Sequence, residues 1–324
     1  MDTLAIAFDR VTKVYQHRQV ALADVTFDVP IGSTVGLLGA NGSGKSTAIR
    51  MALGLISTTA GTVRVFDQPM LPSAKALRHR LGYLSDDPVF PKDINAIEYL
   101  SFVGKAFGLS KLDRNARMAT LLRAVGLSED AGRRIGTYST GMKTRLGVAA
   151  SLMNDPELLV WDEPTAGLDP ISRMQTLDLL EKLRGNKTVI LSSHILGDID
   201  RVCDRLVVLN KGQLLFNGSR HDLENRLPQS ILELRVSGDV SSFRQQVRDQ
   251  LGRDDLCRDG GRLRFEVRKE ENVGQLIPKL IELANKTSVD IEGVNSTGRQ
   301  LEDAYLRLIT DDEFRGFDLA VCRT

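Results

Sequence analysis

The stretch GANGSGKST, residues 39 to 47, constrains the fold of this chain more than any other segment. Gly39, Gly44, Lys45 and Ser46 fit the pattern G-x-x-x-x-G-K-[ST], which joins a buried strand to a helix. The apolar run TVGLLG supplies the strand, and a helical pattern begins at Lys45. Such a loop turns backbone amides toward an anion, and its glycines allow a close approach. The stretch therefore predicts a nucleotide-phosphate site in an α/β fold.

Three nearly continuous apolar runs indicate parallel strands that are buried on both faces. They are TVGLLG (34 to 39), ELLVW (157 to 161) and TVILSS (188 to 193). The segment 20–29 instead alternates apolar and polar residues, as a half-buried antiparallel strand does. Helical patterns between the runs predict a doubly wound core, whose ligands collect at the carboxyl ends of the strands. We therefore expect the polar residues at those ends to converge.

The remaining segments predict an inserted helical region and a second domain. Residues 93–127 have apolar positions at helical spacing and no strand signals. After a linker near residues 227–230, the pattern reads βαββαβ, the ferredoxin-like order. Its elements are a strand at 231–236, a helix at 240–251, a hairpin around 259–261, a helix at 273–284 and a strand at 288–294. The expected domains are 1–227, with a helical subdomain at about 88–150, then 228–310 and a tail at 311–324.

Composition limits the location and the partners of the chain. With 43 basic and 42 acidic residues, the net charge of +1 gives no global attraction to nucleic acid or to an anionic membrane. Cys203, Cys257 and Cys322 are few and far apart, which favours a reducing compartment and free thiols over a metal site. The N-terminus does not resemble a signal peptide, and no apolar run is long enough to span a bilayer. We expect a cytosolic or membrane-peripheral protein.

Two adjacent carboxylates follow the second apolar run. Leaving Asp162 and Glu163 at the end of a buried strand without a cation or a proton-transfer task would be costly. Phosphoryl transfer needs a metal holder and a group that orients the attacking water. Asp162 suits the first role, together with the hydroxyl of Ser46 on Mg²⁺, and Glu163 suits the second. Lys45 places a positive charge at the β and γ phosphates.

Over residues 4–220, the chain resembles the nucleotide-binding subunit of an ATP-binding-cassette (ABC) transporter. The motifs occur in that family's order and spacing. GANGSGKST resembles the Walker A loop, LLVWDE resembles Walker B, and SSH ending at His194 resembles the switch histidine. The D-loop corresponds to AGLD (166 to 169), and the signature segment corresponds to YSTGMKTRL (138 to 146). The ending RQLEDAYLRLI (299 to 309) resembles the tail of cassettes from simple exporters and ABC-2 permease systems.

This resemblance implies a fold, two ligands and a set of site residues. The fold is a P-loop, RecA-like core with an N-terminal antiparallel β subdomain, and the ligands are ATP and Mg²⁺. Lys45, Glu163 and His194 would be catalytic, with Glu163 polarising the attacking water and His194 contacting the γ-phosphate. The residues that would contact ATP are Tyr15, stacked on adenine, the Walker A residues Gly39, Asn41, Gly42, Ser43, Gly44, Lys45, Ser46 and Thr47, and Ser139, Gly141 and Asp169.

Two segments depart from the family pattern. The signature has Thr140 where the first of two glycines is usual, Tyr138 for leucine and Met142 for glutamine, although Ser139 and Gly141 are kept. After Gly-Tyr-x-x, Asp86 replaces Gln or Glu. Its shorter carboxylate can still bind Mg²⁺ through oxygen or water, with altered coupling to a membrane partner. The segment from Phe90 to Tyr99 is either the docking region for that partner or ordinary core packing.

The resemblance implies an ATP-binding and ATP-hydrolysing subunit that drives a separate membrane permease, of exporter type, from the cytoplasmic face of the membrane. Two cassettes would bind two ATP molecules head to tail, and a homodimer is favoured. Two alternatives stay open: a soluble ABC ATPase acting on ribosomes or DNA, and a catalytically weak regulatory cassette. We expect no nucleic-acid partner, because the predicted strands ILELRV and LRFEV lack the aromatic platform for base stacking, having only Phe265.

Overall fold

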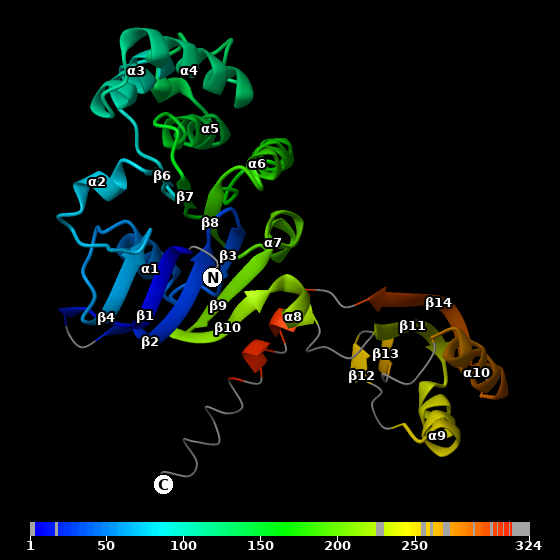
Figure 1. Ribbon diagram of the computed structural model, residues 1–324. Coiled ribbons are helices and arrows are strands. Elements are labelled where there is room, and N and C mark those ends of the chain that lie inside the picture. The colour runs from blue at the N-terminus through cyan, green and yellow to red at the C-terminus, as the bar shows by residue number, and fades with distance from the viewer. Residues whose placement is uncertain are drawn as a thin grey trace. The chain divides into compact units, whose positions relative to one another are not determined.

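The computed structural model divides the chain into two compact units, Met1–Arg220 and His221–Thr324 (Figure 1). The structure describes residues 4–16, 19–224, 230–253, 257–259, 262–267, 273–287, 289–298, 301–302, 304–306, 308–310 and 312. The linker expected near residues 227–230 therefore lies mostly outside the described residues, and so do the hairpin turn at 260–261 and nearly all of the tail.

A six-stranded sheet forms the centre of the first unit, in the order β10-β9-β3-β8-β7-β6. All neighbouring strands are parallel except β10, which is antiparallel to β9. Strands β3, β7 and β8 are buried along their whole length, which confirms the prediction from the apolar runs. The strands are β3 (Thr34–Leu38), β6 (Leu81–Leu84), β7 (Leu158–Trp161), β8 (Thr188–Ser193), β9 (Arg205–Asn210) and β10 (Gln213–Ser219).

An antiparallel sheet in the order β2-β1-β4-β5 packs over the helix that follows the glycine-rich loop. One hydrophobic core joins apolar residues of both sheets with Ala48, Ile49 and Met51 of that helix. The rings of Phe8 and Phe27 stack within the antiparallel sheet, with their centroids 4.3 Å apart. The elements are β1 (Leu4–Val14), β2 (Val20–Pro30), α1 (Lys45–Ala52), β4 (Ala60–Val65) and β5 (Gln68–Pro69).

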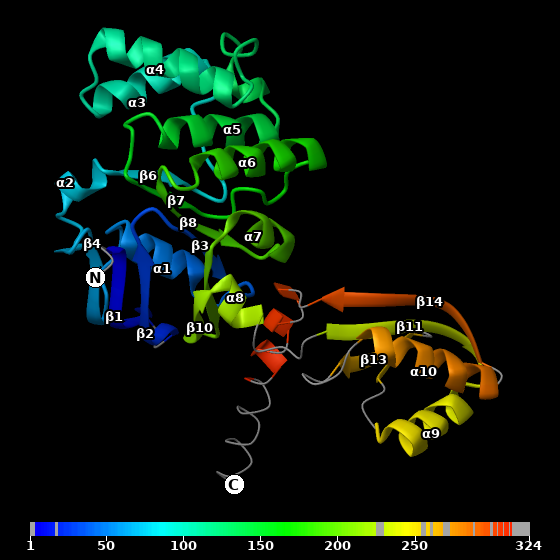
Figure 2. The same ribbon diagram turned by 45° about the vertical axis from the view of Figure 1, so that its right-hand side comes forward.

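Helices α3, α4 and α5 form a helical layer at one end of the first unit (Figure 2). Helix α3 begins with a capping box, in which Asn95 Oδ1 accepts a hydrogen bond from the Glu98 amide and the Glu98 carboxylate accepts one from the Asn95 amide. Besides α1, the described helices of this unit are α2 (Lys75–Arg78), α3 (Ala96–Ala106), α4 (Lys111–Ala124), a 3-10 turn (Ile135–Thr137), α5 (Thr140–Ser151), α6 (Pro170–Leu183) and α7 (Leu196–Val202). Helix α8 (Arg220–Glu224) follows β10.

The second unit has the ferredoxin-like βαββαβ order, with an antiparallel sheet in the order β12-β13-β11-β14. Phe265 packs in the core with apolar residues of both helices, so its ring does not lie on the open face of the sheet. On β11 and β13, Glu233 forms ion pairs with Arg262 and Arg264. The elements are β11 (Ser230–Gly238), α9 (Val240–Leu251), β12 (Cys257–Asp259), β13 (Arg262–Val267), α10 (Val273–Lys286) and β14 (Val289–Gly298).

None of the helices in the described part of the chain combines enough length with enough apolar character to cross a membrane.

The contact between β6 and α5 is close enough to require glycine. A Cβ atom at Gly82 would lie 2.1 Å from the backbone oxygen of Ser151. We expect Gly82→Ala to lower the free energy of unfolding by about 1–3 kcal/mol, because β6 and α5 must move apart. Urea unfolding, followed by the fluorescence of the single tryptophan, Trp161 in β7, measures the loss. Gly132→Ala is the control, because its Cβ would meet nothing within 4 Å, and equal losses would contradict the prediction.

Candidate functional site

The glycine-rich loop connects β3 to α1, and its glycines are required by sterics. Gly44 has φ +109°, and a Cβ there would lie 2.5 Å from Leu22 Cδ2 and 2.7 Å from the Ala21 carbonyl oxygen. A Cβ at Gly39 would lie 2.3 Å from Ser43 Oγ. Asn41 and Gly42 are exposed at the tip, whereas Ser43 is buried and its hydroxyl has no hydrogen-bond partner. The loop therefore presents its backbone at the amino end of α1, where an anion is favoured.

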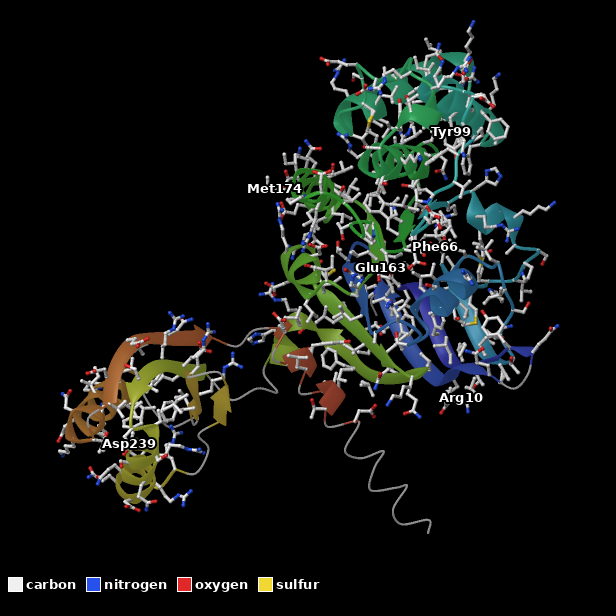
Figure 3. The ribbon with its side chains drawn as sticks, turned by 180° about the vertical axis from the view of Figure 1, so that it is seen from behind. Arg10, Phe66, Tyr99, Glu163, Met174 and Asp239 are labelled. Carbon is white, nitrogen blue, oxygen red and sulfur yellow. The ribbon has the colours of Figure 1, made fainter. Side chains whose placement is uncertain are left out.

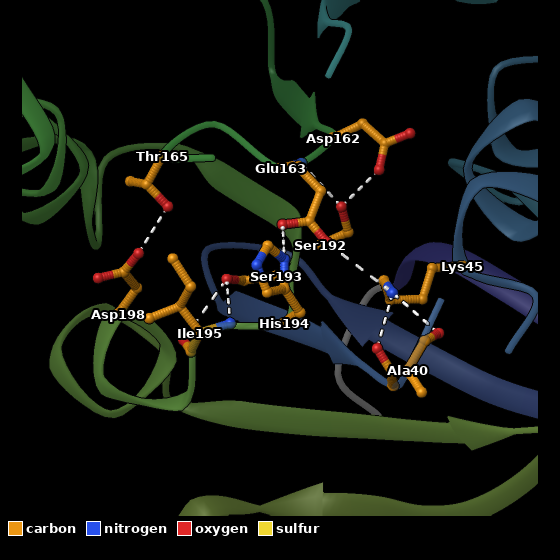
Figure 4. Close-up of polar contacts among 11 residues, drawn as sticks. Ala40, Lys45, Asp162, Glu163, Thr165, Ser192, Ser193, His194, Ile195 and Asp198 are labelled. Atoms are coloured by element: carbon orange, nitrogen blue, oxygen red, sulfur yellow. Dashed lines mark hydrogen bonds and ion pairs between the residues drawn. The ribbon is translucent and has the colours of Figure 1, made fainter. Parts of the chain in front are cut away.

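Lys45 is buried beneath this loop. Its Nζ donates hydrogen bonds to the carbonyl oxygens of Gly39 (2.7 Å) and Ala40 (3.3 Å), and it lies 3.8 Å from Glu163 Oε1 (Figure 4). Burial lowers the pKa of Lys45 below its ordinary value, while the charges of Glu163 and Asp162 oppose that change. The ammonium group is thus held between the loop and the carboxylates that follow β7.

Asp162 follows β7 directly and is buried. Its carboxylate accepts a 2.5 Å hydrogen bond from Ser192 Oγ on β8, and its amide donates to the Leu84 carbonyl oxygen at the end of β6. Burial raises the pKa of Asp162, and the negative charges of Asp86 and Glu163 raise it further. Hydrogen bonds from the hydroxyls of Ser192 and Ser46 oppose that rise. A cation at this position would favour the ionised carboxylate.

Glu163 lies where the chain leaves β7 (Figure 3). Its backbone is left-handed, with φ +47°, which is uncommon for a residue with a side chain and typical of functional sites. The Glu163 amide donates a 2.8 Å hydrogen bond to Ser192 Oγ, and Oε2 lies 2.7 Å from Nδ1 of His194. The Glu163 side chain is only 14% exposed, whereas that of His194 is 53% exposed. The charged cluster consists of Lys45, Asp162, Glu163 and His194.

Tyr15 lies beside the first turn of α1. Its hydroxyl is 3.5 Å from Thr47 Oγ1, and Lys13 Nζ lies 5.3 Å from the centre of its ring. The ring is partly exposed. The structure therefore places an aromatic side chain next to the glycine-rich loop.

The signature residues and Asp169 form a second group. Ser139 caps α5 by accepting a hydrogen bond from the Met142 amide, and Asp169 caps α6 by accepting from the amides of Ile171 and Ser172. A Cβ at Gly141 would lie 2.8 Å from Ser172 Oγ and 3.6 Å from Asp169 Oδ2. Within the described residues, no hydrogen bond or ion pair joins Ser139 or Asp169 to the glycine-rich loop. The predicted site residues thus lie in two groups.

A magnesium site is compatible with the side chains near Asp162. Among the described residues, no group of three or more His, Cys, Asp or Glu is arranged to hold a metal ion. Mg²⁺ needs no such group, because it binds through one or two carboxylates, retained waters and substrate phosphates. Asp162 and Ser46 would supply oxygen ligands, and the exposed Asp86 is near enough for its charge to act on Asp162. The donor set therefore fits Mg²⁺.

Sequence reasoning missed the side chains that support this site. Ser192 contacts both Asp162 and Glu163, and its only sequence signal is its position two residues before His194. Thr165 and Asp198 form a buried hydrogen bond of 2.5 Å between the segments that follow Glu163 and His194. No spacing rule indicated that pair.

Comparisons with known proteins show the family of the chain. Residues 22–166 match the sequence profile described as ABC transporter. The chain is 35% identical over 241 residues to the uncharacterized ABC transporter ATP-binding protein YxlF of Bacillus subtilis, covering 74% of this chain and 80% of that protein. It is 37% identical over 251 residues to the Nod factor export ATP-binding protein I of Bradyrhizobium diazoefficiens, covering 76% and 81%.

One solved structure shows the same fold. It is described as the dimeric post-hydrolysis state of the ATP-binding cassette MJ0796 bound to ADP and Pi. It is 24% identical, has a TM-score of 0.61, and the match covers 66% of this chain and 98% of the solved chain. With identities above 30% over most of the two relatives, the chain belongs to the ATP-binding proteins of ABC transporters, a family of ATPases.

Proposed function

We propose that this chain hydrolyses Mg·ATP as a cassette dimer and thereby drives a separate membrane permease of exporter type, at the cytoplasmic face of a membrane. One observation carries the proposal: the charged cluster gathers at the carboxyl ends of β7 and β8, beside the glycine-rich loop at the end of β3. The relative named for Nod factor export supports an exporter system.

In this proposal, Glu163 orients the attacking water and His194 holds the Glu163 carboxylate in place. Their 2.7 Å contact leaves Glu163 Oε1 directed toward the Lys45 side, at 3.8 Å from Nζ. Lys45 contacts the β and γ phosphates, and the amides of the glycine-rich loop bind phosphate oxygens. Tyr15 stacks on the adenine ring, which its place beside Thr47 supports.

Ser46, Asp162 and Asp86 would hold Mg²⁺. When bound, the ion neutralises charge that develops on the phosphate oxygens. Ser192 fixes the orientation of the Asp162 carboxylate through its hydroxyl. The raised pKa of Asp162, caused first by burial, indicates a carboxylate that a nearby cation would stabilise in its charged form.

The second group of residues supports a dimer. Ser139 and Gly141 lie at the amino end of the 12-residue helix α5, which favours an anion. We propose that they reach the γ-phosphate bound by a second copy, since no hydrogen bond or ion pair links Ser139 to the loop of its own chain in the described residues. Asp169, beside Gly141, then couples the two sites. The solved cassette of the same fold is described as dimeric, which supports the assembly of two copies.

A groove supports docking of a permease segment. It has a volume of about 290 Å³ and is lined by apolar side chains that include Leu55, Tyr83, Tyr99 and Phe107. Tyr99 lies in the helical layer (Figure 3) and packs edge-on against Phe90, so Tyr99 contributes both to packing and to the lining of the groove. Strand β6 runs from the groove to the segment of Asp86, which gives a short path from the permease to the ATP site.

Glu163→Gln should abolish most turnover and leave ATP binding intact, because the amide keeps the shape of the side chain but cannot accept a proton. We expect kcat to fall by a factor of about 10² or more. Steady-state ATPase assays measure it, and size-exclusion chromatography with Mg·ATP should show a trapped dimer. Lys45→Ala is the contrasting variant, because it should weaken nucleotide binding itself. Unchanged turnover in Glu163→Gln would remove that carboxylate from the proposed role.

Asp86→Ala should weaken stimulation by the permease more than ATP binding. Asp86 is exposed, and its carboxylate accepts hydrogen bonds from Ser85 Oγ (3.0 Å) and the Asp87 amide (2.9 Å), so it orders the segment between the groove and Asp162. The ratio of permease-stimulated to basal ATPase activity, with a nucleotide Kd for each variant, measures the effect. Asp87→Ala is the matched control. Equal loss of binding and stimulation in Asp86→Ala would contradict the prediction.

Affinity purification tests the transport proposal directly. The tagged Glu163→Gln chain, held with Mg·ATP in detergent-solubilised cells, should bring down a polytopic membrane protein, because the groove would be occupied in a stable dimer. The same purification with Lys45→Ala shows which partners depend on nucleotide. Recovery of ribosomal components or nucleic acid without a membrane protein would overturn the permease proposal and favour a soluble ABC ATPase.

A further inference from the structure

Building on the hydrolytic role proposed for Glu163, we propose that Asp198 is a positioning residue for ATP hydrolysis. Its buried carboxylate ties the turn that follows Glu163 to the helix that follows His194. Asp198 does not belong to the charged cluster, and it acts through Thr165 and Arg173.

The carboxylate of Asp198 is fully engaged. Its side chain is 1% exposed, on the first turn of α7. Oδ2 accepts a 2.5 Å hydrogen bond from Thr165 Oγ1 (Figure 4), and Oδ1 accepts from Nε (2.7 Å) and a terminal nitrogen (2.6 Å) of Arg173. A charge this deeply buried is costly unless it is paired and hydrogen-bonded. Loss of either partner would therefore disturb the position of α7 relative to its neighbours.

Thr165 anchors the turn that begins at Glu163 by its hydrogen bond to Asp198. It is 2% exposed and lies in a turn closed by bonds from the Ala166 amide to the Glu163 oxygen (3.1 Å) and from the Leu168 amide to the Thr165 oxygen (3.4 Å). Glu163 has strained backbone at φ +47°. A strained residue keeps its conformation only when its surroundings fix it. Thr165 supplies that restraint on the C-terminal side, as Ser192 does at the Glu163 amide.

The two residues that Asp198 contacts, Thr165 and Arg173, lie on either side of Asp169 in the sequence. Arg173 is on the first turn of α6, and its amide donates to the Asp169 oxygen (2.9 Å). Asp198 thus holds the turn before Asp169 through Thr165 and the helix after it through Arg173. The path from Glu163 to Asp169 is fixed against the segment that carries His194. A change in this link should move the reactive carboxylate while leaving the glycine-rich loop in place.

Thr165→Val and Thr165→Ser form a matched pair. Valine keeps the shape of threonine and removes the hydroxyl, whereas serine keeps the hydroxyl. In the full chain with Mg·ATP, we expect Thr165→Val to lower kcat by about tenfold to a hundredfold with the KM for ATP within about twofold, since small misplacement of a reactive group has effects of this size. Thr165→Ser should stay within about threefold of the unaltered chain in kcat.

Substitutions at Arg173 test the same link if variants at the buried Thr165 and Asp198 fold poorly, because the Arg173 side chain is 37% exposed. Arg173→Gln should lower kcat without raising the KM for ATP, and Arg173→Lys should restore part of kcat. The double variant Thr165→Val with Asp198→Asn should be no slower than the slower single variant, because both break one link. Nucleotide Kd and thermal unfolding are measured in parallel.

Two results would overturn the inference: Thr165→Val with kcat equal to that of Thr165→Ser, or a loss of kcat that matches the loss of folded, ATP-binding protein. Turnover by the unaltered chain, and its loss in Glu163→Gln, test the proposed function separately. A chain that hydrolyses ATP normally but is indifferent to Thr165→Val therefore refutes only the positioning role of Asp198.

Discussion

The burial of opposite charges at one edge of the central sheet is the constraint on which the rest of the site depends. Lys45 lies 3.8 Å from Glu163, and burial lowers the pKa of Lys45 and is the largest cause of the raised pKa of Asp162. The charges of Glu163 and Asp162 offset part of the cost of burial for Lys45, whereas hydrogen bonds from Ser192 and Ser46 offset part of it for Asp162. Glycines in the preceding loop allow this approach, since a Cβ at Gly44 would collide with β2. This arrangement of buried positive and negative side chains suits a ligand that brings phosphates and a cation together.

The sequence predicted the fold well wherever a pattern had a single physical cause. Strands β3, β7 and β8 are buried on both faces, so their apolar runs could be identified, and parallel pairing places Asp162 and His194 near the glycine-rich loop. The ferredoxin-like unit followed from the order of strands and helices. The roles of Ser192, Thr165 and Asp198 could not be predicted, because no local sequence pattern marks these residues. Their roles arise from contacts between residues about 30 positions apart.

The unusual signature is accommodated locally. Tyr138 is buried where leucine is usual, and its hydroxyl donates a 2.8 Å hydrogen bond to the Asp130 carbonyl oxygen, so the added polar atom is satisfied. Thr140 begins α5 and is exposed, a position that tolerates a β-branched side chain. Gly141 is the position without room, with Ser172 Oγ 2.8 Å from its would-be Cβ. Sterics therefore explain why this glycine is kept while its neighbour is not.

In the proposed dimer, these contacts divide the ATP site between two sets of elements. The charged cluster and its hydroxyl and carboxylate supports connect β7, β8, α6 and α7, whereas Ser139 starts a helix of the helical layer. Glu163 keeps a strained backbone only because several bonds restrain it, so its position should change little when nucleotide binds. In that proposed dimer, nucleotide binding would change mainly the distance between the charged cluster of one copy and the signature segment of the other. Hydrolysis would then depend on dimer closure, because the charged cluster is already in position and only the signature segment of the second copy has to approach it.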